Sequence, residues 1–188
     1  MEKIELKEKI KSYREDYRHI NIFKRFVNIL IKHIDYSIYK VLIYSQKYKY
    51  YKDKYKHSKT VNDFLMFIYY GKKYFKYSRL TNCEIYGELG KNIKIFHGGV
   101  IINDNAIIGN NVKFHGHNCI GNNGKDNKAP KIGNNVDIGV GSVIIGGVSI
   151  ANNIIIGANS IVTKCFNEDG ITIIGNPAIK IENRKGKK

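Results

Sequence analysis

The sequence predicts a parallel β-helix built from short repeated coils and preceded by an α-helical region. Three observations predict it: a large apolar residue recurs at every sixth position in the second half, Gly and Asn follow these positions, and the Lys- and Tyr-rich first part has helical spacing. A six-residue period fits neither an α-helix nor an alternating strand. It is typical of a β-helix in which each hexad forms one strand and one turn, with every sixth side chain pointing at the axis.

The hexad frame keeps its phase across one twelve-residue gap. Its inward positions are Ile102, Ile108, Phe114, Ile120, Ile132, Ile138, Ile144, Ile150, Ile156 and Val162. A second set lies four residues after some of these positions and consists of β-branched aliphatic or small residues: Val112, Val136, Ser142, Val148, Ile154 and Ser160. We expect the Gly and Asn residues to supply the left-handed conformations that tight corners demand. Three hexads make a triangular coil, so residues 18 apart should stack at about 4.8 Å.

The phase of the repeat is broken twice. Leu89 and Ile95 lie one residue out of phase with Ile102, so the chain should slip at Phe96–Val100. The second break, residues 121–131, lacks inward aliphatic residues and should leave the coil as a loop. Irregular segments of a regular scaffold often carry function, so these two segments form the candidate site.

The chain should divide into a helical region, residues 1–79, and a β-helix domain, residues 80–188, that ends in a short basic tail. Within residues 20–44, apolar residues spaced by three and four predict one amphipathic helix. Its apolar face would pack on the rest of the protein or on a sister subunit, with a membrane surface as the alternative. A further helix should begin at Thr60, where Asp63 completes a capping box.

The positive charge is concentrated in the first part of the chain. Residues 1–80 hold 20 Lys and Arg against 8 Asp and Glu, and 13 of the 14 tyrosines. Such a segment could bind anionic carbohydrate, lipid or a membrane surface, although AT-rich codon usage would give the same composition. We expect no nucleic-acid partner. No signal-peptide pattern is visible, which predicts a cytoplasmic protein, with contact at the inner face of the membrane left open. Cys83, Cys119 and Cys165 lack metal-site spacing and should be reduced apolar fillers, so no metal is expected.

Four features together resemble the hexapeptide-repeat acyltransferases, and within them the serine acetyltransferase group and its bacterial glycan O-acetyltransferase relatives. They are a helical N-terminal region, a His-Gly-Gly segment leading into VIINDNAIIGNN, a loop ending in APKIG before NNVDIGVGSVIIGGVSI, and the closing IVTKCFNEDGITIIGNPAIKI. The resemblance covers residues 82–181. It implies a left-handed coil, acetyl-CoA as cosubstrate, and a homotrimer with active sites between its subunits.

The resemblance also implies roles for individual residues. His97 would be the general base that takes the proton of an acceptor hydroxyl, which then attacks the thioester directly. Glu84 would orient the imidazole, although ungapped counting leads to Asn82 instead. Substrate contacts would come from His115, His117, Asp104 and Lys128. Because His115 follows His97 by 18 residues, we expect it one coil above His97 on the same edge.

The expected coenzyme contacts are Gly139, Val140, Gly141, Ser142, Gly175, Pro177 and Ala178, although a coil corner alone needs the same small residues. Serine acetyltransferases carry Arg-His-Pro in the loop where this chain has Lys128-Ala129-Pro130. A site that loses a polar contact discriminates against its former ligand, which favours a sugar hydroxyl over serine. The expected function is therefore acetyl transfer to a bacterial surface glycan or its precursor. The alternatives are serine O-acetylation and a non-catalytic scaffold that binds an anionic polymer.

Overall fold

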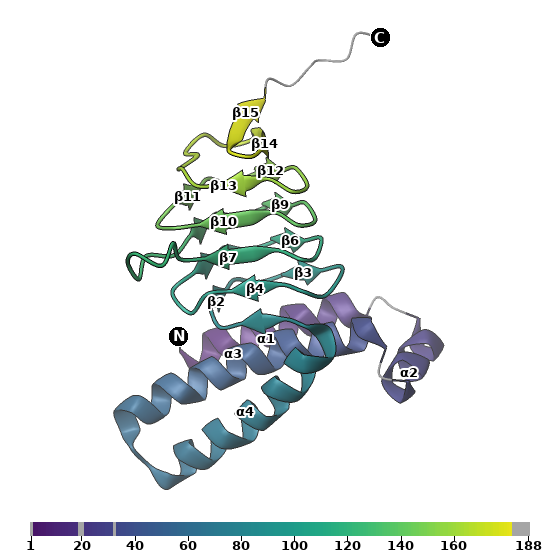
Figure 1. Cartoon of the computed structure of the whole chain (residues 1–188). Helices are drawn as coiled ribbons and strands as arrows, with labels where there is room; N and C mark the ends of the chain where they lie inside the picture. Colours follow the sequence, from purple (N-terminus) through teal and green to yellow (C-terminus); the bar gives the residue numbers. More distant parts are fainter. Residues whose placement is uncertain (1, 19–20, 32, 182–188) are drawn as a thin grey trace. The chain divides into compact units, whose positions relative to one another are not determined.

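The computed structural model describes residues 2–18, 21–31 and 33–181, which form two compact units, Met1–Tyr86 and Gly87–Lys188. The first unit holds α1 (Lys3–Arg18), α2 (Ile22–Leu30), α3 (Ile34–Ser58), α4 (Val61–Thr81) and β1 (Glu84–Ile85) (Figure 1). The boundary expected at 79/80 falls inside α4. The expected basic tail, residues 182–188, lies outside the described residues. Among the helices described, none is long and apolar enough to cross a membrane.

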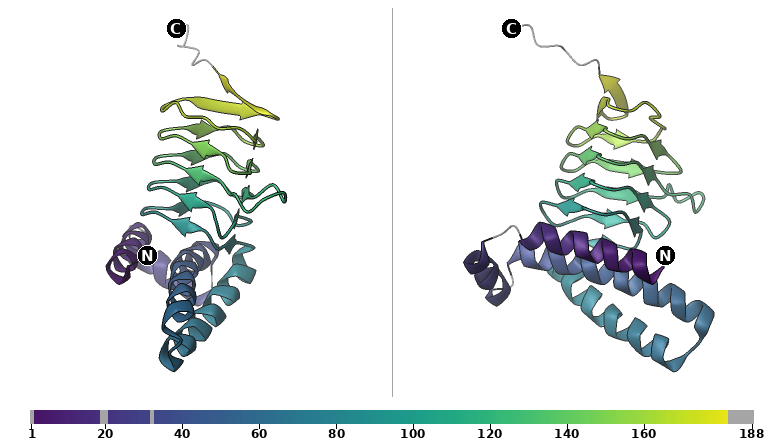
Figure 2. Two further views of the ribbon diagram at one scale, coloured as in Figure 1. Left: turned by 90° about the vertical axis from the view of Figure 1, so that its left-hand side faces the viewer. Right: turned by 180° about the vertical axis from the view of Figure 1, so that it is seen from behind.

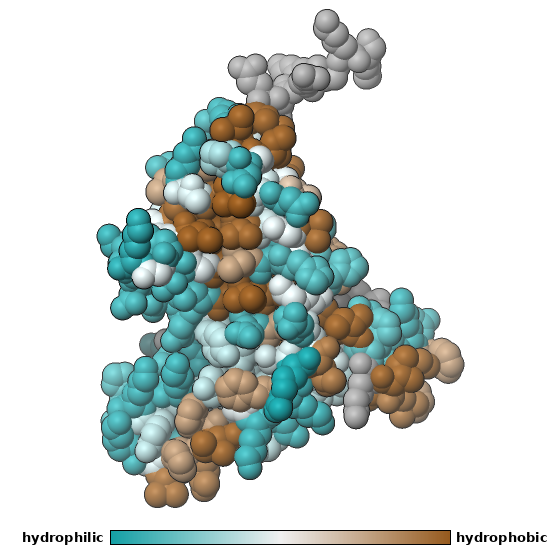
Figure 3. Space-filling model, in the orientation of Figure 1, coloured by the Kyte–Doolittle hydropathy of each residue, from teal (hydrophilic) through white to brown (hydrophobic). Residues whose placement is uncertain are grey.

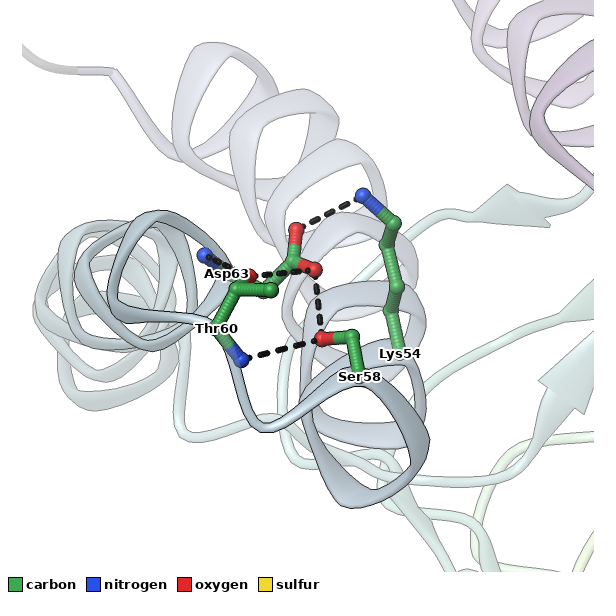
Figure 4. A network of polar contacts seen from close by, with 4 residues as sticks. All are labelled: Lys54, Ser58, Thr60 and Asp63. Atoms are coloured by element: carbon green, nitrogen blue, oxygen red, sulfur yellow. Dashed lines mark hydrogen bonds and ion pairs between the residues drawn. The ribbon is translucent and has the colours of Figure 1, made fainter.

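A buried carboxylate fixes the turn between α3 and α4 (Figure 4). Thr60 is the N-cap of α4, and its hydroxyl oxygen accepts a hydrogen bond from the backbone N–H of Asp63 at 3.2 Å. The Asp63 carboxylate accepts from Lys54 Nζ at 2.7 Å and from Ser58 Oγ at 2.6 Å. These bonds lower the pKa of the Asp63 carboxyl. The predicted helix start at Thr60 is confirmed.

The expectation of one helix over residues 20–44 is wrong. The chain forms two helices instead, because Asn21 caps α2 and His33 caps α3 with their side chains. The break separates the apolar positions that a continuous helix would have aligned. Val41 on α3 is fully buried, whereas Phe23 on α2 is 73% exposed.

The tyrosines of the first unit are largely packing residues. Tyr48 on α3 stacks against Tyr74 of α4, with ring centroids 5.5 Å apart, and against Phe67 at 5.3 Å. Tyr74 is fully buried, and its hydroxyl oxygen accepts from the backbone N–H of Ile85 at 2.7 Å. Much of the aromatic content of this region therefore builds the helix–helix core.

The second unit is a stack of short parallel strands (Figures 1 and 2). Sheet A contains the strands β4 (Ile101–Ile102), β7 (Cys119–Gly121), β10 (Val143–Ile145) and β13 (Ile161–Val162). Sheet B contains β2 (Glu88–Leu89), β5 (Ile107–Ile108), β8 (Lys131–Ile132) and β11 (Ser149–Ile150). Sheet C contains β3 (Lys94–Ile95), β6 (Lys113–Phe114), β9 (Asp137–Ile138), β12 (Ile155–Ile156), β14 (Thr172–Gly175) and β15 (Ala178–Ile181). Only β14 and β15 pair antiparallel in these sheets.

The hexad frame is confirmed by burial. All ten predicted inward residues are at most 3% exposed, and the second set, from Val112 to Ser160, is buried as well. The two buried serines of that set, Ser142 and Ser160, satisfy their hydroxyls by donating to the carbonyl of Gly157. The expectation for the cysteines is wrong in one case, because Cys165 is exposed whereas Cys83 is buried.

The strand registers confirm both predicted irregularities. Regular coils place residues 18 apart, as in Ile101 opposite Cys119. Just before the slip the spacing is 19, with Lys94 opposite Lys113, so Phe96–Val100 holds one residue more than the corner that follows it. Across residues 121–131 the spacing is 24, with Ile107 opposite Lys131. This segment projects from the stack between β7 and β8 as the expected loop (Figure 2).

Gly and Asn have different roles at the corner between sheets B and C. The left-handed residues there are asparagines, Asn92, Asn111, Asn135 and Asn153, with φ between 55° and 58°. Their side-chain amides form a ladder along the corner, each donating to the next at 2.9 to 3.0 Å. Gly109 has no positive φ, but a Cβ there would lie 2.5 Å from the carbonyl oxygen of Gly133. The expectation that glycine supplies the left-handed turn is wrong here, because this glycine permits close contact between coils.

Candidate active site

The corner between sheets C and A stacks the segments 97–100, 115–118, 139–142 and 157–160, and we call it the histidine corner. Backbone hydrogen bonds join its successive levels. The N–H of His117 donates to the carbonyl of Gly98 at 3.0 Å, and that of Gly141 donates to Gly116 at 3.0 Å. The structure therefore brings the predicted base, two further predicted histidines and the first group of predicted coenzyme contacts onto one edge of the coil.

His97 is exposed and faces a glycine on the next coil. A Cβ on Gly116 would lie 2.7 Å from the Cβ of His97, so the absence of a side chain there is required. Phe96, rather than His97, stacks on His115, with ring centroids 4.8 Å apart. His115 lies one coil above His97 on the same edge, as expected, but it is offset by one position, because the additional residue in Phe96–Val100 places Phe96 opposite it.

His115 forms a close pair with a carboxylate that the sequence reasoning missed. His115 Nε2 and Asp137 Oδ1 are 2.7 Å apart, and both side chains are partly exposed. Lys113 Nζ lies 3.6 Å from the other carboxylate oxygen. A carboxylate at one ring nitrogen fixes the tautomer and leaves Nδ1 as the available acceptor. Adding the six loop residues to the 18-residue coil places Asp137 opposite Lys113, two residues before His115, so the count brings the carboxylate near the histidine without identifying the pair.

Two residues of the next coil pack beside the segment that begins with His97. His117 is exposed at φ 52°, and its Nδ1 would lie 2.7 Å from a Cβ on Gly99. Asn118, also missed from the sequence, is buried. Its carbonyl oxygen accepts from the Gly116 N–H at 3.0 Å, and its amide nitrogen donates to the Gly139 carbonyl at 2.7 Å. Asn118 therefore holds the glycine that faces His97.

Three of the predicted site residues lie elsewhere. Asp104 is at the opposite end of sheet A, in the turn between β4 and β5, and Lys128 is in the loop between β7 and β8. These two segments are joined, since Asn105 donates to the carbonyl of Asn127 at 3.0 Å. We call the corner formed by these two segments the loop corner. Within one chain, sheet A separates the loop corner from the histidine corner. Glu84 is an exposed residue of β1 in the first unit, and its pairing with His97 stays a prediction.

The expected coenzyme contacts are accessible only in part. The side chains of Ser142 and Ala178 are buried, so neither is available to a ligand. Gly139 is required by coil packing, because a Cβ there would lie 2.5 Å from the backbone nitrogen of Ala158. Gly141 has φ +72°, a conformation that favours glycine for backbone reasons alone. The accessible members of the set are Val140, Gly175 and Pro177.

One cysteine adjoins the histidine corner. Cys119 begins β7, next to the histidine corner, and burial raises the pKa of its thiol. Because the thiolate is the reactive form, this shift disfavours an acyl-enzyme at Cys119. In the part of the chain that the structure describes, no group of three or more His, Cys, Asp or Glu residues could hold a metal ion.

Comparison with known proteins finds serine acetyltransferases among the relatives of this chain. No family model matches the chain. Serine acetyltransferase of Staphylococcus epidermidis is 38% identical over 112 residues, covering 56% of this chain and 52% of that protein. Serine acetyltransferase of Synechococcus elongatus is 36% identical over 103 residues, covering 52% of this chain and 42% of that protein. The chain thus spans about half the length of the relatives it matches.

Solved structures extend the likeness over nearly the whole chain. Soybean serine acetyltransferase complexed with serine matches 94% of this chain and 70% of its own, with a TM-score of 0.69 and 23% identity. Neisseria gonorrhoeae serine acetyltransferase matches 96% of this chain and 68% of its own, with a TM-score of 0.69 and 21% identity. These neighbours show that the second unit is a left-handed β-helix, as expected. The chain is therefore similar, in sequence over about half its length and in fold over most of it, to the serine acetyltransferase-like group of hexapeptide-repeat acyltransferases.

Proposed function

We propose that the protein is an acetyl-CoA-dependent O-acetyltransferase whose base lies at the histidine corner. The observation that carries the proposal is the exposed side chain of His97, which lies at this corner in the segment where the repeat gains one residue. The imidazole removes the proton of the acceptor hydroxyl as its oxygen attacks the thioester carbonyl. The C–S bond then breaks, and coenzyme A leaves as the thiol after taking up a proton. The names of the relatives support this chemistry.

L-Serine is the first acceptor to consider. The relatives at 36–38% identity are serine acetyltransferases, and the matches extend over 112 and 103 residues. This comparison favours serine over the sugar acceptor that the loop sequence suggests.

One observation keeps a sugar hydroxyl as the second candidate. Ala129 stands where serine acetyltransferases carry a loop histidine, and it is only 7% exposed, so it offers a ligand neither a polar group nor much surface. The remaining charge, Lys128, is exposed, with its Nζ 3.9 Å from a carboxylate oxygen of Asp126. A loop without that histidine has lost a contact to a small amino acid and is open to a larger acceptor.

We further propose that the active unit is an oligomer, as a homotrimer would provide. The outer face of sheet A carries an apolar stripe, which Figure 3 shows over β7 and β10. Its residues, exposed or half-buried in the single chain, are Ile101, Cys119, Val143, Ile145 and Ile161. Self-association through this face would remove the stripe from water. It would also allow the loop corner of one copy to approach the histidine corner of another, which sheet A prevents within one chain.

Thiol release from acetyl-CoA, measured with L-serine and with a panel of sugars and nucleotide sugars, tests the proposal. We expect turnover with one acceptor class and a rate loss of at least ~10²-fold in His97→Ala with folding intact. Turnover of serine alone would exclude the sugar candidate, and turnover of a sugar alone would exclude serine. A complete lack of turnover with every acceptor would favour a non-catalytic scaffold.

The pair formed by His115 and Asp137 provides the competing choice of base. If His115 is the base, Asp137→Asn should lower kcat and alter its pH profile, because the amide no longer fixes the tautomer. If His97 is the base, Asp137→Asn should change KM more than kcat, whereas His97→Ala should remove the limb of the profile that reports the base. Measuring both variants side by side assigns the proton acceptor.

A further inference from the structure

The helix α2 turns its apolar side to solvent. Five apolar residues, Ile22, Phe23, Phe26, Ile29 and Leu30, are spaced by one, three and four along its nine residues, and all are exposed. We call them the α2 apolar face, and Figure 3 shows the corresponding apolar surface over α2. The buried residue of the helix is instead the polar Asn28, at 3% exposed. A helix normally buries its apolar stripe, and an exposed apolar face of this kind is typical of an interaction surface.

A cavity lined by cations adjoins this helix. It has a volume of about 340 Å³ and lies among α1, α2 and α3. Arg14, Arg25 and Lys40 line it together with Ile29 of the α2 apolar face and the tyrosines 17, 36 and 39. The cavity thus continues directly from the apolar surface to a group of three positive charges.

The charges around the cavity favour an anion. Burial lowers the pKa of the Lys40 ammonium, and the like charges of Arg14, Lys47 and Lys73 lower it further. A half-buried cation among other cations gains most from an anionic ligand that neutralises it. Residues 21–31 contain Lys24 and Arg25 but no Asp or Glu, so the helix itself supplies no competing carboxylate.

We propose that the first unit docks on an anionic membrane surface, with the α2 apolar face inserted among the lipid chains and the cavity of Arg14, Arg25 and Lys40 holding a lipid phosphate. A short helix with Phe, Ile and Leu on one side and basic residues beside them matches an interfacial helix that lies in the plane of a bilayer. Charge complementarity selects this occupant over a second copy of the chain, because two copies meeting here would place their cation clusters together. The inference does not depend on the proposed acetyl transfer.

Vesicle flotation tests the docking. The protein should float with vesicles that contain phosphatidylglycerol, bind at least tenfold less to vesicles of phosphatidylcholine alone, and bind more weakly as salt rises. The double variant Phe23→Ser, Phe26→Ser should lower the partition coefficient by about 100-fold, and Arg25→Gln by about fivefold. The matched control is Val61→Ser, Leu65→Ser, which removes two exposed apolar side chains of α4, 75% and 59% exposed, and should leave binding unchanged.

A fluorescence measurement reports insertion directly. The chain has no Trp, so Phe26→Trp introduces a single reporter on the α2 apolar face. Its emission should shift to the blue on addition of anionic vesicles, whereas a Trp placed by Phe64→Trp should not respond. Inorganic phosphate or glycerol phosphate should produce no blue shift, since neither offers an apolar phase.

Three outcomes would overturn the proposal. They are failure of the wild-type protein to bind anionic vesicles, binding that the double Phe→Ser variant leaves unchanged, and a loss of oligomer mass in that variant without vesicles. The last result, obtained by light scattering, would assign the face to a second copy of the chain.

Discussion

The asparagine ladder predicts an unusual order of stabilities at one position of the β-helix. Asn135 has φ 56°, and its amide bonds to Asn111 on one side at 2.9 Å and to Asn153 on the other at 3.0 Å. Asn135→Ala removes both bonds and places a Cβ-bearing residue without a compensating amide in the left-handed region. Asn135→Gly removes the same bonds but relieves the backbone.

The magnitudes of the two effects can be separated. Each exposed amide–amide bond contributes about 0.5 kcal/mol to the free energy of unfolding, so both variants lose about 1 kcal/mol. Alanine at positive φ costs about 1 kcal/mol more than glycine. We therefore expect losses of about 2 kcal/mol for Asn135→Ala and about 1 kcal/mol for Asn135→Gly. In a chain of this size these correspond to falls in Tm of roughly 4–8 °C and 2–4 °C.

Thermal unfolding followed by far-ultraviolet circular dichroism measures this order. Asn134 is the matched control. It lies in the same corner and is hydrogen-bonded to Asn152 of the next coil, but it has no positive φ. There the order should reverse, with Asn134→Ala more stable than Asn134→Gly, because glycine only adds unfolded-state entropy. If Asn135→Ala were as stable as Asn135→Gly, the left-handed backbone would not be the reason for asparagine at this corner.

Three further predictions concern the N-cap, the buried carboxylate and the core. Thr60→Ala should lower the free energy of unfolding by about 1 kcal/mol in urea titrations, because the N-cap bond to Asp63 is lost. The pKa of Asp63 is lower in the folded protein than in the unfolded chain. Its ionised carboxylate therefore stabilises the fold above about pH 4, and this stabilisation is lost as the pH falls further. Asp63→Asn should make the free energy of unfolding depend less on pH in the acid range. Phe114, fully buried between Ile95 and Ile138 of adjacent strands, should cost about 3–5 kcal/mol when replaced by Ala and less than about 1.5 kcal/mol when replaced by Leu, as chemical denaturation would show.

The β-helix could be predicted from the sequence because its burial pattern is local. A coil buries the same hexad position every time, so one repeat of apolar residues determines both strand and register, as Ile102 and Ile144 illustrate. The helical unit was harder to predict. Apolar spacing alone predicts one amphipathic helix over residues 20–44. The capping side chains of Asn21 and His33 instead start two separate helices, and Phe23 on the first is exposed. Capping chemistry outweighed periodicity there.

The side-chain contacts of the candidate site depend on the number of residues between strands. For this reason the segments that form the site could be predicted from the sequence, but not all of the contacts between them. A break in the phase of the repeat shows which corner is irregular. The exact number of residues in that corner decides which side chains stack on the next coil. The additional residue in Phe96–Val100 places Phe96 rather than His97 against His115. The six residues added by the loop likewise bring Asp137 to His115 at 2.7 Å. Both displacements act on the same corner, and together they leave His97 facing Gly116 with its ring exposed while the neighbouring histidine is held by a carboxylate. Deleting one of Gly98 or Gly99 should therefore give β3 and β6 the 18-residue spacing of a regular coil, with Phe96 still opposite His115. It would shorten only the corner that carries His97, and it should lower turnover without removing any predicted catalytic residue.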